Sequence, residues 1–257
     1  MALARDEERA ALMPFMTGGF PTTAAAAAVA ESYLDGGADL IELGVPYSDP
    51  LADGPVIHQA ATEALAAGAS FDSALKCVAE VVDRVPIVAM IYVNVIFAYG
   101  RERFVDRLAA AGVAGLIVPD LPLEQGPWLR EALAPHGIAL VGLIAPTTSP
   151  TRRTAICRAS EGFVYAVSVT GVTGERVELA PGLADMIAAA KQVSSTPVAV
   201  GFGISSADQA RAVAVHADGV IIGSRLVRLV AEAPPGDRTV ALGPFLAEIR
   251  AALQRRR

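Results

Sequence analysis

The sequence contains little cysteine, few aromatic residues and no excess of positive charge. Its two cysteines, Cys77 and Cys157, have no Cys or His neighbour at metal-ligand spacing, which argues against both a disulfide framework and a metal site. Free thiols of this kind are typical of a reduced, cytoplasmic protein. The net charge of -6 gives no electrostatic reason to expect a nucleic-acid partner.

Long apolar runs are missing as well. The longest, residues 87–99, falls short of the roughly 20 residues that a membrane-spanning helix requires, and Asn94 interrupts it. The segment Met1–Ala10 is charged and lacks the apolar core of a secretion signal. These features predict no membrane partner and a cytoplasmic location.

What the sequence does contain is a repeated alternation of short apolar runs and longer amphipathic ones. The short runs are bounded by glycine or proline, as expected for strands buried on both faces of a parallel sheet. The predicted strands are Leu12–Thr17, Asp39–Leu43, Ile87–Tyr92, Gly115–Val118, Ala139–Ile144, Gly162–Val167, Pro197–Val200 and Gly219–Ile222. The predicted helices are Thr22–Asp35, Phe71–Arg84, Arg101–Ala111, Glu124–Pro135, Pro150–Ser160, Gly182–Val193, Ser205–Val215, Ser224–Val230 and Thr239–Arg255.

This alternation predicts an α/β fold with a parallel sheet. Eight such units in 257 residues fit a single-domain (β/α)8 TIM barrel that spans residues 1–257. The alternative is an open doubly wound sheet, which usually carries a glycine-rich dinucleotide loop after its first strand. Here residues 17–21 read TGGFP, which lacks that fingerprint. In a barrel, catalytic groups lie at the C-terminal ends of the strands, so polar residues at these ends are the candidates for catalysis.

Glu42 is the first candidate, because it lies near the C-terminal end of the second predicted strand. A carboxylate within so apolar a run is costly unless it is paired or protonated. Partial burial would raise its pKa and prepare it for proton transfer near neutral pH. The alternative is a buried glutamate in a structural ion pair.

Asp53 is the second candidate, in the loop that follows this strand. Three prolines and two glycines occur from Gly44 to Pro55, and proline restricts the backbone so that such a loop holds a side chain still. Asp53 would then form a carboxylate pair with Glu42. Alternatively, Asp53 is a turn residue or a helix cap.

Three glycine-containing loops follow the last three predicted strands, at residues 170–174, 201–205 and 223–224. In barrels, a phosphate often binds at the loops after strands seven and eight, at the N-terminus of a short extra helix. Glycine lets backbone N–H groups approach the phosphate, and the helix end adds a favourable field. The loops therefore predict a phosphorylated ligand, and the alternative is three unrelated turns.

The stretch from Leu40 to Pro55, LIELGVPYSDPLADGP, resembles the signature of the tryptophan synthase alpha subunit family. Further segments agree in order along nearly the whole chain: Pro14–Pro21, Tyr92–Asn94, Pro119–Pro122, Gly171–Gly174, Gly201–Ser205 and Gly223-Ser224. The resemblance implies a TIM barrel. It also implies a carbon–carbon lyase of tryptophan biosynthesis, which reversibly cleaves indole-3-glycerol phosphate to indole and glyceraldehyde 3-phosphate.

The resemblance also implies roles for individual residues. Glu42 would be the catalytic acid/base, and Asp53 would hydrogen-bond the indole N–H. Tyr165 would border the reacting end of the substrate, and Thr173 would help to close the site over Asp53. The indole pocket would be lined by Phe15, Tyr92, Ile144 and Phe202, unless these are ordinary core residues. The phosphate contacts would come from Gly174, Gly203, Gly223 and Ser224.

The resemblance implies a partner as well. Alpha subunits of this family pair with a beta subunit that carries pyridoxal phosphate, in an alpha-beta-beta-alpha tetramer, and the alpha chain itself has no cofactor. The contact surface would include the loop around Asp49–Leu51, the segment Asn94–Tyr99, and Pro122.

Three other functions compete with this interpretation. A stand-alone lyase that releases free indole would share the same site residues. A non-catalytic regulator of a beta subunit is disfavoured because both Glu42 and Asp53 are present. Another phosphosugar barrel, such as an isomerase, would need a different acid/base pair at other strand ends.

Overall fold

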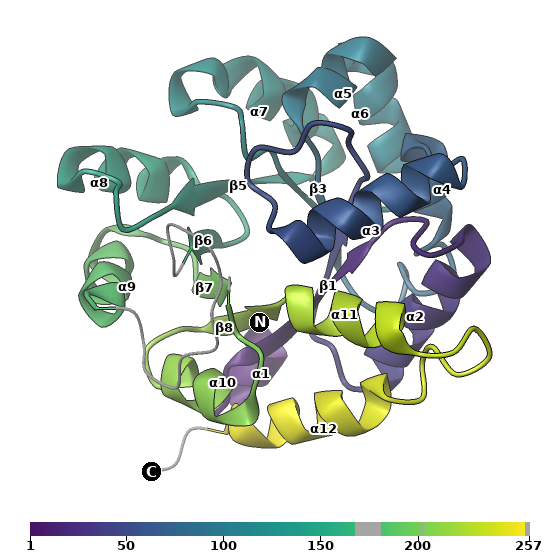
Figure 1. Ribbon diagram of the computed structural model, residues 1–257. Coiled ribbons are helices and arrows are strands. Elements are labelled where there is room, and N and C mark those ends of the chain that lie inside the picture. The colour runs from purple at the N-terminus through teal and green to yellow at the C-terminus, as the bar shows by residue number, and fades with distance from the viewer. Residues whose placement is uncertain (168–180, 202, 255–257) are drawn as a thin grey trace.

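The computed structural model describes residues 1–167, 181–201 and 203–254 (Figure 1). Its strands form a closed barrel in which β1 pairs in parallel with both β2 and β8. This closure excludes an open doubly wound sheet and confirms the predicted TIM barrel. The strands are β1 (Ala11–Thr17), β2 (Ile41–Gly44), β3 (Ile87–Met90), β4 (Gly115–Ile117), β5 (Ala139–Ile144), β6 (Val164–Val167), β7 (Val198–Gly201) and β8 (Gly219–Ile222).

Helices surround the strands (Figure 1). Those that match the predictions are α2 (Thr23–Asp35), α4 (Phe71–Lys76), α6 (Arg101–Ala110), α7 (Pro127–Leu133), α8 (Pro150–Ala159), α9 (Leu183–Val193), α10 (Ala207–Ala214), α11 (Ser224–Glu232) and α12 (Leu242–Ala252). Short 3-10 turns, η1 (Leu123–Gln125) and η2 (Ala134–His136), flank α7. None of these helices, nor any other in the described part of the chain, is long and apolar enough to cross a membrane.

Three helices are not among the predictions, namely α1 (Ala2–Asp6), α3 (Pro55–Ala66) and α5 (Val93–Tyr99). Helix α3 begins directly after Gly54 with Pro55 in its first turn, where proline's missing N–H costs nothing. Helix α5 occupies the second part of the apolar run 87–99, after the predicted strand Ile87–Tyr92. In contrast, the predicted helix Phe71–Arg84 ends early, at Lys76.

The barrel interior is filled by side chains from alternate positions of the strands, as strand geometry requires. The outer faces of the strands pack against the helices in a second and larger cluster. The interior cluster contains Ala11, Met13, Leu40, Val88, Met90, Ile117, Val141, Phe163, Tyr165, Ala199 and Ile221.

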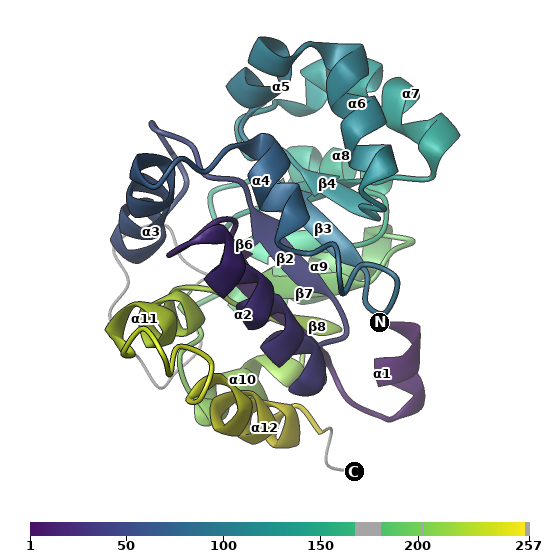
Figure 2. The same cartoon turned by 90° about the vertical axis from the view of Figure 1, so that its right-hand side faces the viewer.

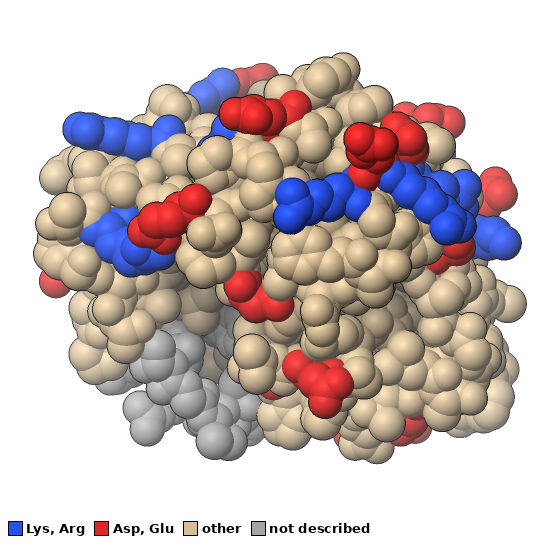
Figure 3. All heavy atoms as spheres, turned by 90° about the horizontal axis from the view of Figure 1, so that it is seen from above, with Lys and Arg blue, Asp and Glu red and all other residues tan. Residues whose placement is uncertain are grey.

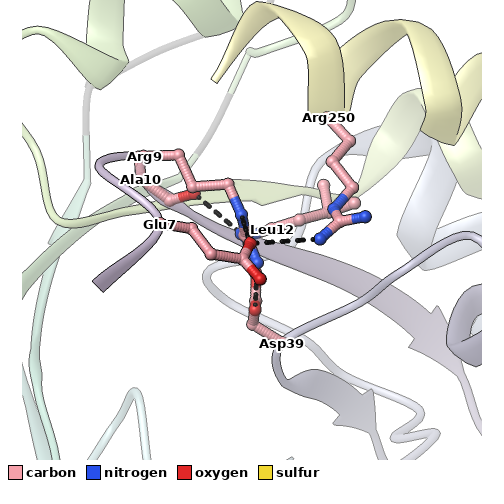
Figure 4. Close-up of polar contacts among 6 residues, drawn as sticks. All are labelled: Glu7, Arg9, Ala10, Leu12, Asp39 and Arg250. Atoms are coloured by element: carbon pink, nitrogen blue, oxygen red, sulfur yellow. Dashed lines mark hydrogen bonds and ion pairs between the residues drawn. The ribbon is translucent and has the colours of Figure 1, made fainter. Parts of the chain in front are cut away.

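The N-terminal end of the barrel is closed by α1, which lies at the opposite end of the molecule from α3 (Figure 2). A buried arginine, Arg9, fixes this end: it bonds Asp39 with a 2.8 Å Nη2–Oδ1 contact and Glu7 with a 2.7 Å Nε–Oε2 contact (Figure 4). Glu7 in turn accepts a bond from Arg250 on α12. The network ties the N-terminal segment to the start of β2 and to the last helix, and leaves the C-terminal strand ends for the site.

Candidate active site

Glu42 is the second residue of β2, with only 1% of its surface exposed. It is paired in register with Phe15 on β1 and Val88 on β3. Among the described residues it has no ion-pair partner, and its Oε2 has no hydrogen-bond partner. Burial, and secondarily the charge of Asp53, raises the pKa of Glu42 to about 8. A protonated, unpaired carboxyl fits a proton donor and disfavours the structural ion pair.

Asp53 lies in the loop between β2 and α3, where Tyr92 fixes it. The Tyr92 hydroxyl interacts with the Asp53 carboxyl and accepts the Ala52 N–H at 2.9 Å, one residue before Asp53. Burial raises the pKa of Asp53, while the Tyr92 hydrogen bond and the charge of His58 lower it. Because Gly54 is the N-cap of α3 and no side chain caps that helix, the capping role for Asp53 is wrong.

Tyr165 lies on β6 in the barrel interior, fully enclosed. Burial, together with the charges of Glu42 and Asp53, raises the pKa of Tyr165 well above its ordinary value. A side chain at Gly201 would overlap the Tyr165 hydroxyl, so glycine at that position leaves room for the ring. The structure therefore gathers Glu42, Asp53 and Tyr165 into one electrostatically coupled group.

Phe15 extends this group toward β8. A side chain at Gly44 would overlap the Phe15 ring, and one at Gly223 would lie 3.6 Å from the Phe15 Cβ. The ring therefore occupies the space between β2 and β8, beside Glu42. This position fits an apolar wall for an aromatic ligand.

Three of the four residues expected to contact the phosphate, Gly203, Gly223 and Ser224, are among the described residues. Gly203 has a left-handed backbone with φ of +80° and open space where a side chain would be. Gly223 is the N-cap of α11, and Ser224 is the first residue of that helix. A helix N-terminus attracts anions through its free N–H groups and its dipole. Thr173, Gly174 and Phe202, which were also expected at the site, lie outside the described residues.

Ile144, which the family resemblance assigns to the indole pocket, lies at the end of β5. On β5, Val141 belongs to the interior cluster and Leu143 packs against it, whereas Ile144 belongs to the larger cluster, which also contains Phe15. A side chain at Gly142, which has the same parity as Ile144, would meet Ile156 on α8. Position 142 therefore faces the helices and Leu143 the barrel interior, and the pocket role of Ile144 stays a prediction. A shift of one residue along a strand reverses the face.

Sequence reasoning missed two further residues near the site. Thr17 ends β1 with a buried hydroxyl, and His58 acts on Asp53 through its charge. Strand alternation counted from Met13 points to Thr17, but no sequence signal distinguishes His58. Across the described residues, no cluster of His, Cys, Asp or Glu has the arrangement of a metal site.

Comparison with known proteins places this geometry in a family. The family model for the tryptophan synthase alpha chain matches residues 1–245. The alpha chain of Synechocystis sp. is 50% identical over 252 residues, covering 97% of this chain and 96% of the relative. That of Gloeobacter violaceus is 46% identical over 247 residues, covering 95% and 90%.

Solved structures agree with the sequence comparison. Mycobacterium tuberculosis tryptophan synthase superposes with a TM-score of 0.91 at 36% identity, covering 99% of this chain and 96% of the solved one. The alpha subunit from Legionella pneumophila gives a TM-score of 0.88 at 32% identity, covering 98% and 95%.

The chain belongs to the tryptophan synthase alpha chain family. Tryptophan synthase alpha chains reversibly cleave indole-3-glycerol phosphate to indole and glyceraldehyde 3-phosphate, so this chain is a carbon–carbon lyase of tryptophan biosynthesis. Membership of the tryptophan synthase alpha family implies a beta subunit as partner and disfavours a stand-alone lyase. The alpha chain itself needs no cofactor.

Proposed function

We propose that Glu42 and Asp53 divide the acid–base work of indole-3-glycerol phosphate cleavage. The observation that carries this proposal is the buried, unpaired Glu42 carboxyl, whose pKa of about 8 keeps it protonated at neutral pH. The Glu42 carboxyl gives its proton to indole C3, and the Asp53 carboxylate accepts a hydrogen bond from the ring N–H as positive charge develops there.

The second half of the reaction returns the proton. The Glu42 carboxylate takes the proton of the glycerol hydroxyl next to the scissile bond, and a carbonyl forms at that carbon. The carbon–carbon bond breaks, and its electron pair returns to the ring, which restores neutral indole. Glu42 ends protonated, so the cycle is redox-neutral and needs no further reactant. Tyr165 borders the reacting atoms, and its neutral hydroxyl supplies a hydrogen-bonding group beside the two carboxyls.

The remaining site residues would hold the two ends of the substrate. Gly203, Gly223 and Ser224 bind the phosphate, supported by the N-terminus of α11. Phe15, Tyr92 and Ile144 border the indole, and Leu143 is the residue of β5 that packs against the interior cluster. Thr173, Gly174 and Phe202 are assigned to site closure, to the phosphate and to the indole pocket, respectively, by the family resemblance alone.

The test is indole release from indole-3-glycerol phosphate by wild type, Glu42→Gln and Asp53→Asn. Loss of a positioned acid/base costs about a factor of 10² to 10⁴ in rate, so we expect at least a hundredfold fall in kcat for Glu42→Gln. Asp49→Asn, in the same loop, is the matched control and should retain activity when assayed without a beta subunit. Wild-type activity together with undiminished activity of Glu42→Gln would refute the assignment.

We propose further that two copies join two pyridoxal-phosphate-containing beta subunits in an alpha-beta-beta-alpha tetramer. The face for the partner is the C-terminal end of the barrel, where Leu51 is 87% exposed and Phe97 is 47% exposed. Phe97 stacks on Trp128, and the Arg101 guanidinium lies 4.4 Å from the Trp128 ring centroid. Exposed aromatic and arginine side chains are the groups that protein interfaces favour.

A single domain over residues 1–257 and a cytoplasmic location complete the proposal. The closed barrel supports the first, because β1 and β8 pair directly and α12 packs against α2. The free, buried cysteines Cys77 and Cys157 support the second. On the face seen in Figure 3, basic and acidic side chains are interspersed, which suits protein and metabolite contacts better than a polyanion.

A further inference from the structure

The Thr17 hydroxyl is a buried polar group for which neither the fold nor the assigned chemistry has a use. Thr17 is 4% exposed, and its Oγ1 has no hydrogen-bond partner among the described residues. Its backbone is fixed, because the Thr17 carbonyl accepts the Phe20 N–H at 3.1 Å and Gly18 donates to the Gly44 carbonyl at 2.8 Å. A buried hydroxyl without a partner is destabilising, and valine would fill the same volume without that cost. The hydroxyl therefore needs a partner that binds there.

The side chain of Thr17 faces the barrel interior. Met13 of the same strand lies in the interior cluster, and Phe15 covers the interior position Gly44. Gly18, the next residue, faces outward toward Ala74 on α4. By strand alternation, Thr17 points inward at the C-terminal rim. It is paired in register with Gly44, two residues beyond Glu42, whose Oε2 is also buried without a partner.

The order of the strands places Thr17 between the two ends of the reaction. In the closed barrel, β1 lies between β8, which leads to Gly223 and Ser224, and β2, which carries Glu42. A substrate whose phosphate binds at α11 and whose reacting carbon lies at Glu42 must pass its glycerol chain across the end of β1. We propose that the Thr17 hydroxyl binds a hydroxyl of that glycerol chain and so positions the scissile bond. This inference rests on the proposed function of Glu42 and of the phosphate loops.

The test compares two ligands on three variants. Indole-3-glycerol phosphate carries the glycerol hydroxyls, whereas indole-3-propanol phosphate keeps the ring, the three-carbon chain and the phosphate but lacks both hydroxyls. Thr17→Val removes the hydroxyl at nearly constant volume, and Thr17→Ser retains it. Thr154→Val is the matched control, because the Thr154 hydroxyl donates to the Pro150 carbonyl within α8, at 3.1 Å.

We expect Thr17→Val to lower kcat/KM for the substrate by about 10- to 100-fold, which at 1.4 kcal/mol per factor of ten is about 1.4 to 2.8 kcal/mol. The inhibition constant of the propanol analogue should change less than about twofold, and Thr17→Ser should stay within about threefold of wild type on both ligands. The melting temperature of Thr17→Val should not fall, because an unpaired buried hydroxyl is removed.

Three results would overturn the inference. Unchanged kcat/KM in Thr17→Val would show that the hydroxyl does not touch substrate. An equal loss for substrate and analogue would show a distorted pocket, and a failure of Thr17→Ser to retain activity would show that the methyl group matters instead. If wild type does not cleave the substrate, the proposed function is refuted, and the inference with it. The wild-type assay therefore distinguishes a failure of the proposed function from a failure of the Thr17 role alone.

Discussion

At the scale of single residues, Glu42 makes stability depend on pH. Its folded-state pKa is raised to about 8, above the ordinary value of 4.5, so the folded protein holds a proton that the unfolded chain has lost between these pH values. The free energy of unfolding should therefore fall as pH rises through this window, by up to about 1.4 kcal/mol per pH unit from this group. Glu42→Gln removes the effect, and should be more stable than wild type at pH 8 but not at pH 4.5.

Urea unfolding of the two proteins across pH 4.5 to 9 measures this difference directly. A constant difference between Glu42→Gln and wild type over the range would mean that Glu42 titrates normally. The same group sets the rate: wild-type kcat/KM should decline above about pH 8, as Glu42 loses the proton that it gives to the ring.

Tyr92 holds the loop at Asp53, because its hydroxyl accepts the Ala52 N–H and interacts with the Asp53 carboxyl. In Tyr92→Phe, the Ala52 N–H loses its acceptor and Asp53 loses the hydroxyl that lowers its pKa. The acidic limb of the pH–rate profile should therefore move to higher pH, and kcat should fall by about 5- to 30-fold. Tyr47→Phe is the control, because Tyr47 stacks on Tyr92 at 5.1 Å but its hydroxyl bonds Asn94. An equal effect in both variants would assign the loss to packing.

At the scale of elements, the Arg9 network makes the N-terminal closure of the barrel a determinant of stability rather than of catalysis. In Arg9→Met, the nearly buried Asp39 carboxylate loses its ion pair and keeps the hydrogen bond from the Leu12 N–H. Breaking a buried pair lowers the free energy of unfolding by about 3–5 kcal/mol. Arg84→Met breaks an exposed pair with Glu31 and should cost less than about 1 kcal/mol. Urea unfolding gives both values, and kcat of folded Arg9→Met should match wild type. Similar costs for the two variants would contradict the role of burial.

The elements also show what the sequence can predict. Strand β5 was predicted with the observed bounds because its apolar run ends at clear boundaries. Which of its residues face the interior could not be predicted, because position along a strand, not composition, decides the face. Helix α3 was missed because Gly54-Pro55 indicates a loop as readily as the first turn of a helix. Glu42 was predictable as a carboxylate in an apolar run. The interaction of Tyr92 with Asp53 was not, because only folding brings these two groups together.

At the scale of the whole molecule, the barrel separates a closed end that holds α1 from an open end that carries the site and the proposed partner surface (Figure 2). Trp128, the only tryptophan in the chain, lies against Phe97 at the open end, so its fluorescence should change when a beta subunit binds. Titration of the beta subunit into this chain, followed by tryptophan emission or calorimetry, gives the Kd of the pair.

Two exposed leucines at opposite ends provide the discriminating comparison. Leu51 is 87% exposed in the loop after β2, and Leu3 is 75% exposed on α1. Burying a leucine side chain contributes about 1.5–3 kcal/mol, so Leu51→Ser should weaken beta-subunit binding by about 10-fold or more. Leu3→Ser should change it less than about twofold. If Leu3→Ser weakened binding as much as Leu51→Ser, the partner would have to contact the closed end. Indole that leaves the C-terminal strand ends would then have no direct path to the beta subunit.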